Sequence, residues 1–384
     1  MPTIQSTSIF ATAPDGAKSP DSITAGNNSI WVEYGDSAKS DGSAGSSTIV
    51  QYDLLGTVQN TYTLPGLADG LKVDPATGDV WALQNQDGNS TVTLIDPATN
   101  QVSAPLGYAP PYAYGATSTR GYDDVAFVGQ KVFLSYTNPK NPGDPVVQQL
   151  TNGTAPFGSL QTTDVLRLGD TGTNLATGEL NQPLPVMDPD SLKSLPDGSL
   201  ILTGEGDKAF TIITNPGTTQ QSASFVTLPA GSASPDDVIM PTATSGTFYI
   251  SNQNDNNIVA AKVTDLNTND LYASVGTAVD QIDPKTGTVT PVVTGLNGSH
   301  GLLFVPAASG APDLASVLQN VSQDLYQAFA NIGLSTSSGT GQGGSSGSMG
   351  AASNPSVPSA ASIISLVGGD ASNALALLLP TAKG

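Results

Sequence analysis

Short apolar stretches, separated by polar turns, recur along the first 300 residues of the chain. In residues 30–34, 132–136 and 247–251, β-branched and aromatic side chains dominate, as on a half-buried pleated surface. The turns between them are rich in Gly, Asn, Asp and Pro, for example at residues 26–29 and 196–198. The pattern therefore predicts an all-β protein built from short strands and hairpins.

Six of these strands begin alike, with an acidic residue or a histidine, then Ser, Gly or Asp, then a branched apolar residue. The six starts are Asp21-Ser22-Ile23, Asp69-Gly70-Leu71, Asp123-Asp124-Val125, Asp190-Ser191-Leu192, Asp236-Asp237-Val238 and His300-Gly301-Leu302. They are spaced by 48, 54, 67, 46 and 64 residues, and about four strands fit in each unit. This repeat predicts a six-bladed β-propeller, in which the starts meet at one mouth of a central channel.

The sixth unit is incomplete. Its inner strand is expected at residues 300–305, but no middle strands are evident, because residues 247–251 and 257–263 are assigned to the fifth unit. Residues 8–13 stand just before the first start, where an outer strand belongs. We expect this segment to pair with the last blade, which closes the ring and protects its edges.

Composition changes after residue 308, so the propeller is assigned to residues 1–308. Apolar spacing predicts an amphipathic helix over 309–333, followed by a Gly/Ser-rich linker over 334–357 and an apolar C-terminal tail over 358–384. We expect this helical tail region to pack on the propeller or to contact another subunit. An export or attachment signal is the alternative.

The charge balance excludes several classes of partner. The chain has 12 Lys and Arg against 32 Asp and Glu, a net charge of −20, which repels nucleic acid and anionic membrane surfaces. It has no Cys, hence no disulfide or thiolate chemistry, and no apolar run long enough to span a membrane. No signal peptide is visible, but the acidic, Ser/Thr/Asn-rich composition favours an extracellular or periplasmic protein; a cytoplasmic location stays open.

Carboxylate and amide oxygens around the predicted channel mouth are hard ligands that suit Ca²⁺. We expect a divalent cation, Ca²⁺ before others, at a metal site formed by Glu33, Asp124, Asn252 and Asp237. His300, the only histidine, is the candidate general base, and Glu205, between two glycines, is the second candidate catalytic residue.

A structural interpretation competes with the metal site. Asp at a strand start often caps a turn by accepting backbone N–H bonds, and a single His is often a structural hydrogen-bond partner. In two starts the carboxylate is doubled, at Asp123-Asp124 and Asp236-Asp237. The sequence leaves open which member of each pair faces the channel.

The blade starts 19–23 (Ser-Pro-Asp-Ser-Ile) and 234–238 (Ser-Pro-Asp-Asp-Val) resemble those of six-bladed propellers of the NHL-repeat, SMP-30/gluconolactonase-like and streptogramin-lyase-like groups. Ser299-His300-Gly301-Leu302 resembles the Pro-His-Gly-Ile start of the lyase-like group. The resemblance covers roughly residues 8–306. Gluconolactonase-like enzymes hold a divalent cation with Glu, Asn and Asp, which implies such roles for Glu33, Asn252 and Asp237. This chain departs from them by offering Asp where they offer Asn.

Two functions are compatible with these features, and the sequence leaves open whether the protein is an enzyme. The first is a metal-dependent hydrolase of a lactone or ester, acting on a small-molecule substrate at the channel mouth. The alternative is a non-catalytic exported binding or scaffold propeller that contacts a cell-surface ligand.

Overall fold

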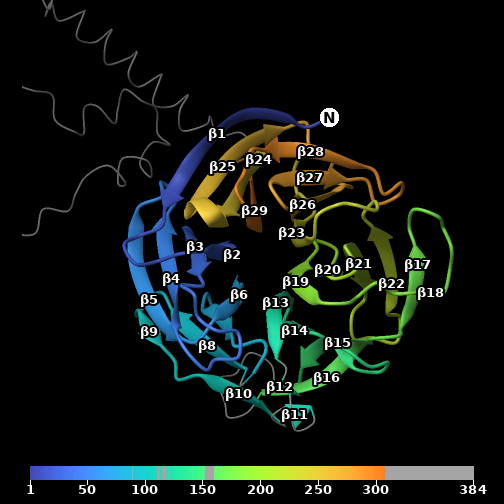
Figure 1. Ribbon diagram of the computed structural model, residues 1–384, viewed down its shortest axis with the longest axis horizontal. Coiled ribbons are helices and arrows are strands. Elements are labelled where there is room, and N and C mark those ends of the chain that lie inside the picture. The colour runs from blue at the N-terminus through green and yellow to red at the C-terminus, as the bar shows by residue number, and fades with distance from the viewer. Residues whose placement is uncertain (89, 110–112, 115–117, 120, 152–159, 308–384) are drawn as a thin grey trace, which may run out of the picture. The chain divides into compact units, whose positions relative to one another are not determined.

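Six blades of antiparallel strands surround a central channel in the computed structural model (Figure 1). The structure describes residues 1–307, apart from residues 89, 110–112, 115–117, 120 and 152–159. The predicted six-bladed propeller is confirmed, whereas the segments predicted over 309–333, 334–357 and 358–384 lie outside the described residues. Within the described part of the chain, no helix is long and apolar enough to cross a membrane.

The first four blades follow the chain from the channel outward. Blade one contains β2 (Pro20–Gly26), β3 (Ser29–Tyr34), β4 (Ser46–Asp53) and β5 (Val58–Pro65). Blade two contains β6 (Ala68–Val73), β7 (Val80–Gln84), β8 (Thr91–Asp96) and an outer strand in two pieces, β9 (Gln101–Val102) and β10 (Leu106–Ala109). Blade three contains β13 (Tyr122–Val128), β14 (Lys131–Tyr136), β15 (Pro145–Leu150) and β16 (Leu160–Arg167), and blade four β19 (Pro189–Ser194), β20 (Leu200–Gly204), β21 (Ala209–Thr214) and β22 (Ser222–Thr227).

Short strands extend the outer edges of these blades. β10 pairs in parallel with β16, which joins blades two and three at their rims. β17 (Thr171–Asn174) pairs in parallel with β22 and carries β18 (Gln182–Pro183), while β11 (Ala113–Tyr114) and β12 (Ser118–Thr119) form a small hairpin. The edges of these blades are therefore partly covered, which limits pairing with other chains.

Blades five and six exchange strands. The inner strand β23 (Pro235–Ile239) pairs with β26 (Leu271–Val275), followed by β27 (Ala278–Ile282) and β28 (Val289–Thr294). The intervening β24 (Gly246–Asn252) and β25 (Asn257–Thr264) lie in blade six, beside its inner strand β29 (Ser299–Pro306). The assignment of residues 247–251 and 257–263 to the fifth unit was therefore wrong: they are the middle strands that blade six was missing.

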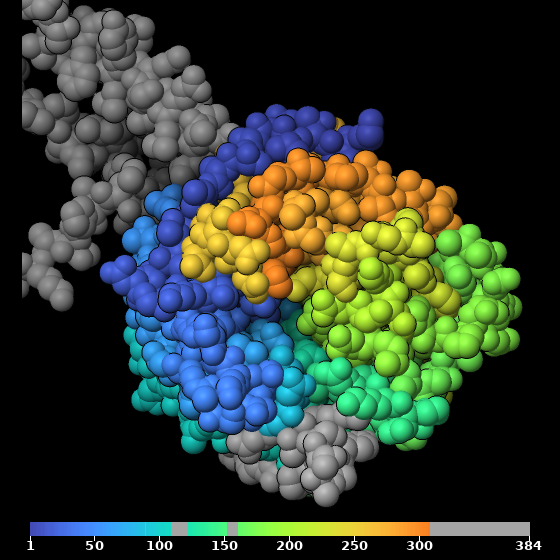
Figure 2. All heavy atoms as spheres, in the orientation of Figure 1, coloured from blue at the N-terminus to red at the C-terminus, as the bar shows by residue number. Residues whose placement is uncertain are grey.

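The N-terminal strand β1 (Thr3–Thr12) completes blade six and closes the ring (Figure 1). It pairs antiparallel with β25 from Thr3 opposite Thr264 to Thr12 opposite Asn257. The predicted closure by the N-terminal segment is thus confirmed, with a strand that begins earlier than residue 8. Figure 2 shows the blades following one another in chain colours around a central depression.

The repeated start is a β-bulge in every blade. In blade one, Pro20 faces Tyr34 and Ile23 faces Val32, so Asp21 and Ser22 together oppose the single residue Glu33. The same register shift occurs at the other five starts. A bulge bends the inner strand and re-aims side chains, so both members of each start can serve the channel.

Glycine at the second position of a start reflects close contact between blades. A Cβ on Gly70 would lie 2.3 Å from the carbonyl oxygen of Asp123 in blade three. A Cβ on Gly301 would lie 2.2 Å from the carbonyl oxygen of Asp21, where blade six meets blade one. Such distances exclude any side chain, so these glycines allow the inner strand of blade two to approach that of blade three, and the inner strand of blade six to approach that of blade one.

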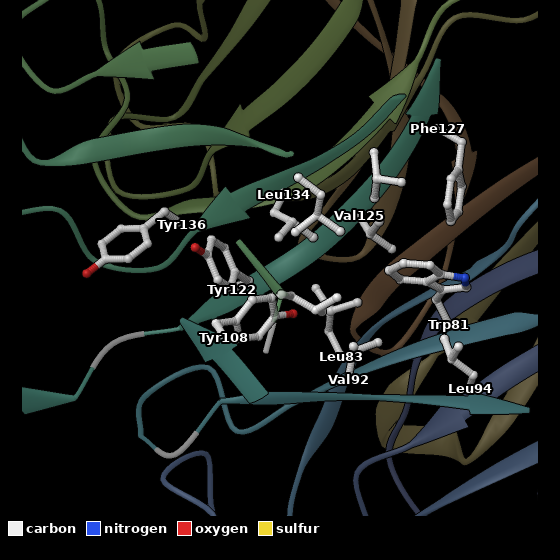
Figure 3. Packing of buried hydrophobic residues seen from close by; sticks show 13 residues of the cluster. Trp81, Leu83, Val92, Leu94, Tyr108, Tyr122, Val125, Phe127, Leu134 and Tyr136 are labelled. Atoms are coloured by element: carbon white, nitrogen blue, oxygen red, sulfur yellow. The ribbon is translucent and has the colours of Figure 1, made fainter. Parts of the chain in front are cut away.

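Aromatic and aliphatic side chains fill the space between blades. Between blades two and three, the Trp81 ring packs edge-on against Phe127 at 5.5 Å, and Tyr108 lies 4.5 Å from Tyr122 (Figure 3). Full burial of one such side chain contributes about 1.5–3 kcal/mol. A buried apolar cluster of this kind lies between every pair of neighbouring blades. This packing holds the six starts in a fixed ring.

Candidate functional site

A polar cavity of 250 Å³ opens at the end of the channel where the inner strands begin, and we call this end the upper mouth. It is lined by eight carboxyl groups and one imidazole, and no lysine or arginine is among the described residues that line it. The first residue of every start contributes: Asp21, Asp69, Asp123, Asp190, Asp236 and His300. We call the five acidic members the ring carboxylates. The rest of the acidic lining comes from Asp87, Asp188 and Glu205.

His300 lies between two ring carboxylates of neighbouring blades. Its Nδ1 is 2.8 Å from Oδ1 of Asp236 and 3.6 Å from Oδ2 of Asp21. One ligand atom from each of these three residues lies within 4.8 Å of the others. The side chains of His300, Asp21 and Asp236 are 30%, 28% and 22% exposed, so a solute in the cavity can reach them.

Burial and mutual repulsion raise the pKa of the ring carboxyls. Burial is the main cause for Asp69, whose pKa rises to about 7 with a further contribution from Asp236. Burial and neighbouring carboxylates also raise the pKa of Asp21, Asp123 and Asp190 well above its usual range. The ring therefore retains protons near neutral pH, and a bound cation would relieve the repulsion.

The pKa of His300 moves in the opposite sense to that of most buried imidazoles. Burial lowers the pKa, but contact with Asp236 and the charges of Asp21 and Glu205 outweigh it and raise it to about 9. Without a cation beside it, the imidazole is thus protonated at neutral pH and forms an ion pair with Asp236.

Glu205 and His300, the two predicted catalytic residues, line the same cavity. Glu205 follows β20, and its backbone N–H donates to the carbonyl oxygen of Asp188 at 2.9 Å. Burial raises the pKa of Glu205, and the carboxyls of Asp236 and Asp188 raise it further. A carboxyl group with a raised pKa in an open cavity is suited to proton transfer near neutral pH.

The structure gives each of the four predicted metal ligands, Glu33, Asp124, Asn252 and Asp237, surroundings of its own. Glu33 is fully buried behind the bulge of blade one, and none of the described residues donates a hydrogen bond of good geometry to either carboxyl oxygen. Burial, with smaller effects of Asp21 and Asp69, raises the pKa of Glu33 well above its usual range. Asn252 holds a turn instead: its Nδ2 donates to Asp255 Oδ2 at 3.0 Å, and its Oδ1 accepts from the backbone N–H of Asn297 at 2.6 Å.

Asp124 is a clamp between blades. Its Oδ2 accepts the backbone N–H of Leu192 at 3.0 Å and forms an ion pair with Lys72 Nζ at 3.1 Å. Its Oδ1 also accepts the N–H of Val125 at 2.8 Å. Blade three is thereby joined to blades two and four, and Asp124 has the capping role that was the structural interpretation.

Asp237 repeats this arrangement at blade five. Its Oδ2 accepts from Lys193 Nζ at 2.6 Å and from the backbone N–H of Leu302 at 2.7 Å. Burial is the largest effect and opposes the charge, but the ammonium groups of Lys193 and Lys72, with the hydrogen bonds from Lys193 and Ser191, together outweigh it and lower the pKa of Asp237. In both doubled starts the first Asp thus lines the upper cavity, and the second binds backbone and lysine.

Sequence reasoning missed Lys72 and Lys193, although a signal was present. Each falls three residues after the acidic start of its blade, in Asp69-Gly70-Leu71-Lys72 and Asp190-Ser191-Leu192-Lys193. It also missed Asp87 and Asp188, which reach the cavity from loops outside the repeated motif.

The residues around His300 fit a divalent cation. Ca²⁺ binds oxygen ligands at about 2.3–2.6 Å, so two ligands of one ion lie at most roughly 5 Å apart, and one ligand atom from each of these three residues lies within 4.8 Å of the others. The carboxylates of Asp21 and Asp236 are hard ligands of the kind Ca²⁺ prefers, and the imidazole adds a nitrogen that Mn²⁺ or Zn²⁺ also accepts.

Comparison with known proteins finds similar folds at low sequence identity. No family model and no curated protein matches the chain. A structure of streptogramin B lyase matches 78% of this chain and 94% of its own, with 15% identity and a TM-score of 0.46. A gluconolactonase from Xanthomonas campestris matches 79% of this chain and 88% of its own, with 13% identity and a TM-score of 0.45. The periplasmic gluconolactonase of Pseudomonas aeruginosa matches 74% of this chain and 88% of its own, with 13% identity and a TM-score of 0.44.

Proposed function

We propose that the upper mouth is the active site of a hydrolase that cleaves a lactone or ester with a bound divalent cation. The observation that carries the proposal is the position of His300 between Asp21 and Asp236, inside a cavity that Glu205 also lines. A cavity of 250 Å³ has room for a small molecule. Eight surrounding carboxyl groups repel anions, which favours a neutral substrate.

Asp21, Asp236 and His300 would hold the cation, with Ca²⁺ and Mn²⁺ the first ions to test. When bound, such an ion polarises a carbonyl group and lowers the pKa of water. We assign His300 to this ligand set and not to the general base, because its Nδ1 faces the two carboxylates that would share the cation. In the metal-free protein the imidazole, with a pKa of about 9, carries a proton at neutral pH. Cation binding at this site would then release the imidazole proton.

Glu205 is the residue we assign to proton transfer. Its carboxylate takes a proton from the attacking water, whose oxygen bonds to the carbonyl carbon. Glu205 then returns the proton to the alkoxide oxygen as the ester C–O bond breaks, so the products are a carboxylic acid and an alcohol. The raised pKa of Glu205 supports both halves of this transfer.

The proposal is tested by measuring cation binding and turnover separately. Metal-free protein is titrated with Ca²⁺, Mg²⁺, Mn²⁺ and Zn²⁺ in a thermal shift assay, and turnover is screened with δ-lactones and p-nitrophenyl esters. We expect Glu205→Gln to reduce turnover about 10²–10⁴-fold and to keep the cation-induced shift. Asp236→Asn should abolish both, whereas Asp15→Asn, on an exposed turn, should change neither.

Two outcomes would contradict the hydrolase. A cation-induced shift without cleavage of any lactone or ester would support the alternative, a cation-dependent binding propeller. No shift with any ion would remove the metal site as well. An extracellular or periplasmic location remains a proposal that rests on the acidic, cysteine-free composition.

A further inference from the structure

A second cavity, of 160 Å³, opens at the opposite end of the channel, where the inner strands end. We call this end the lower mouth. None of the residues that line it also lines the upper mouth, and the space between the two holds only 20 Å³, about one water molecule. The two mouths are therefore separate compartments.

The lower cavity combines an apolar wall with two ammonium groups. Ile239 and Met240 of blade five and Leu303 and Phe304 of blade six are part of the wall, and Lys72 and Lys193 are its charged members. Among the described residues that line it, none is acidic. This lining is opposite in charge to that of the upper mouth.

Both ammonium groups keep donors for a ligand. Lys193 Nζ donates to Asp237 at 2.6 Å and to the carbonyl oxygen of Leu302 at 3.2 Å, and Lys72 Nζ donates to Asp124 at 3.1 Å. An ammonium group has three N–H donors, so these contacts leave some unused. Each lysine side chain is 15% exposed, and both line the cavity.

The carboxylates paired with these lysines also accept hydrogen bonds from other donors. Besides Lys193, Asp237 accepts from the backbone N–H groups of Val238 and Leu302 and from the hydroxyl of Ser191. Asp124 likewise accepts two backbone N–H groups. Part of the negative charge of each carboxylate is therefore balanced by these donors, and the ammonium groups of Lys72 and Lys193 face the lower cavity.

We propose that the lower mouth binds a small organic monocarboxylate with an apolar body about the size of a benzene ring. Its carboxylate meets Lys72 and Lys193, and its body packs against the apolar wall. The size follows from the volume: a protein cavity of about 150 Å³ with apolar walls accommodates benzene. The positive charge of the two lysines favours an anion in the lower mouth, while the carboxyl groups that line the upper mouth exclude it there.

Three ligands of equal size and different charge test this site: benzoate, benzyl alcohol and benzylamine, each titrated into the full chain by calorimetry. We expect benzoate to bind at least tenfold more tightly than the other two, because a charge-assisted hydrogen bond is worth about that factor. Equal affinity for all three, or a preference for benzylamine, would overturn the proposal.

A blocking variant locates the binding. Ser194→Trp places an indole at the exposed rim of the cavity without replacing Lys72, Lys193, Asp124 or Asp237, and it should abolish benzoate binding. The matched control is Gln130→Trp, in the exposed turn after β13, whose blade contributes no described residue to the cavity. If Ser194→Trp binds benzoate as well as Gln130→Trp does, the site lies elsewhere and the proposal fails.

A charge variant tests the recognition. Lys72→Met should lower the affinity for benzoate at least tenfold and leave the affinity for benzyl alcohol unchanged. An unchanged affinity for benzoate would refute the role of the lysines, and the Ser194→Trp result decides the question independently if Lys72→Met does not fold. Neither result depends on cation binding or turnover at the upper mouth.

Discussion

Replacing one ring carboxylate, by Asp69→Asn, should stabilise the metal-free protein, and more so at higher pH. Burial and the neighbouring Asp236 raise the pKa of Asp69 from 3.8 to about 7. Between these values the folded state binds a proton that the unfolded state has lost. The contribution of the Asp69 carboxyl to the free energy of unfolding is therefore largest below pH 4, and it falls as the pH rises to about 7. Asparagine cannot ionise and avoids this loss.

The size of the effect follows from the shift. About three pKa units at about 1.4 kcal/mol each give an upper bound of about 4 kcal/mol above pH 7. Asp69 shares its repulsion with other ring carboxylates and is partly exposed, so a smaller value is expected. We expect the advantage of the variant to grow by about 1–3 kcal/mol between pH 5 and pH 8.

Urea unfolding followed by tryptophan fluorescence, in EDTA at pH 5 and pH 8, measures this difference. Asp15→Asn, which removes an exposed carboxylate, is the control and should show no pH-dependent gain. An Asp69→Asn protein that is less stable than wild type at pH 8, or whose advantage does not change with pH, would refute electrostatic strain in the ring.

Four further variants test the fold. Gly301→Ala should destabilise the protein by several kcal/mol, because its Cβ would lie 2.2 Å from a carbonyl oxygen of blade one; a urea midpoint equal to wild type would contradict the close approach. Asp237→Asn should cost about 3–5 kcal/mol in the same assay, since it leaves the buried Lys193 ammonium without its counter-charge. Trp81→Ala should lower the free energy of unfolding by about 3–5 kcal/mol and lower the thermal midpoint, because it leaves a cavity in the interface between blades two and three. Deletion of residues 1–12 exposes the edge of β25, and light scattering should then detect association; a stable monomer would argue against β1 as the closing strand.

The candidate site was predictable where it depends on the repeat. A fixed motif at the head of each inner strand must recur at equivalent positions of a closed ring, so the meeting of Asp21, Asp69, Asp123, Asp190, Asp236 and His300 followed from sequence. The roles of the doubled carboxylates did not. Whether Asp123 or Asp124 faces the cavity depends on how the bulge turns two adjacent side chains, and on Lys72 and Leu192 in other blades.

The sequence by itself determined the strands, the six starts and the closure by the N-terminal segment, because alternation, turn residues and spacing are local properties of the chain. Only the tertiary structure decided which inner strand the segments Gly246–Asn252 and Asn257–Thr264 join. Both inner strands, β23 and β29, offer a backbone edge for pairing and bury apolar side chains such as Val238 and Leu302, so burial of one face does not specify the partner. Only the tertiary structure also decided that the channel has two compartments. The carboxyl groups of the upper mouth and the lysines of the lower mouth lie at opposite ends because the six bulges pack against one another between them.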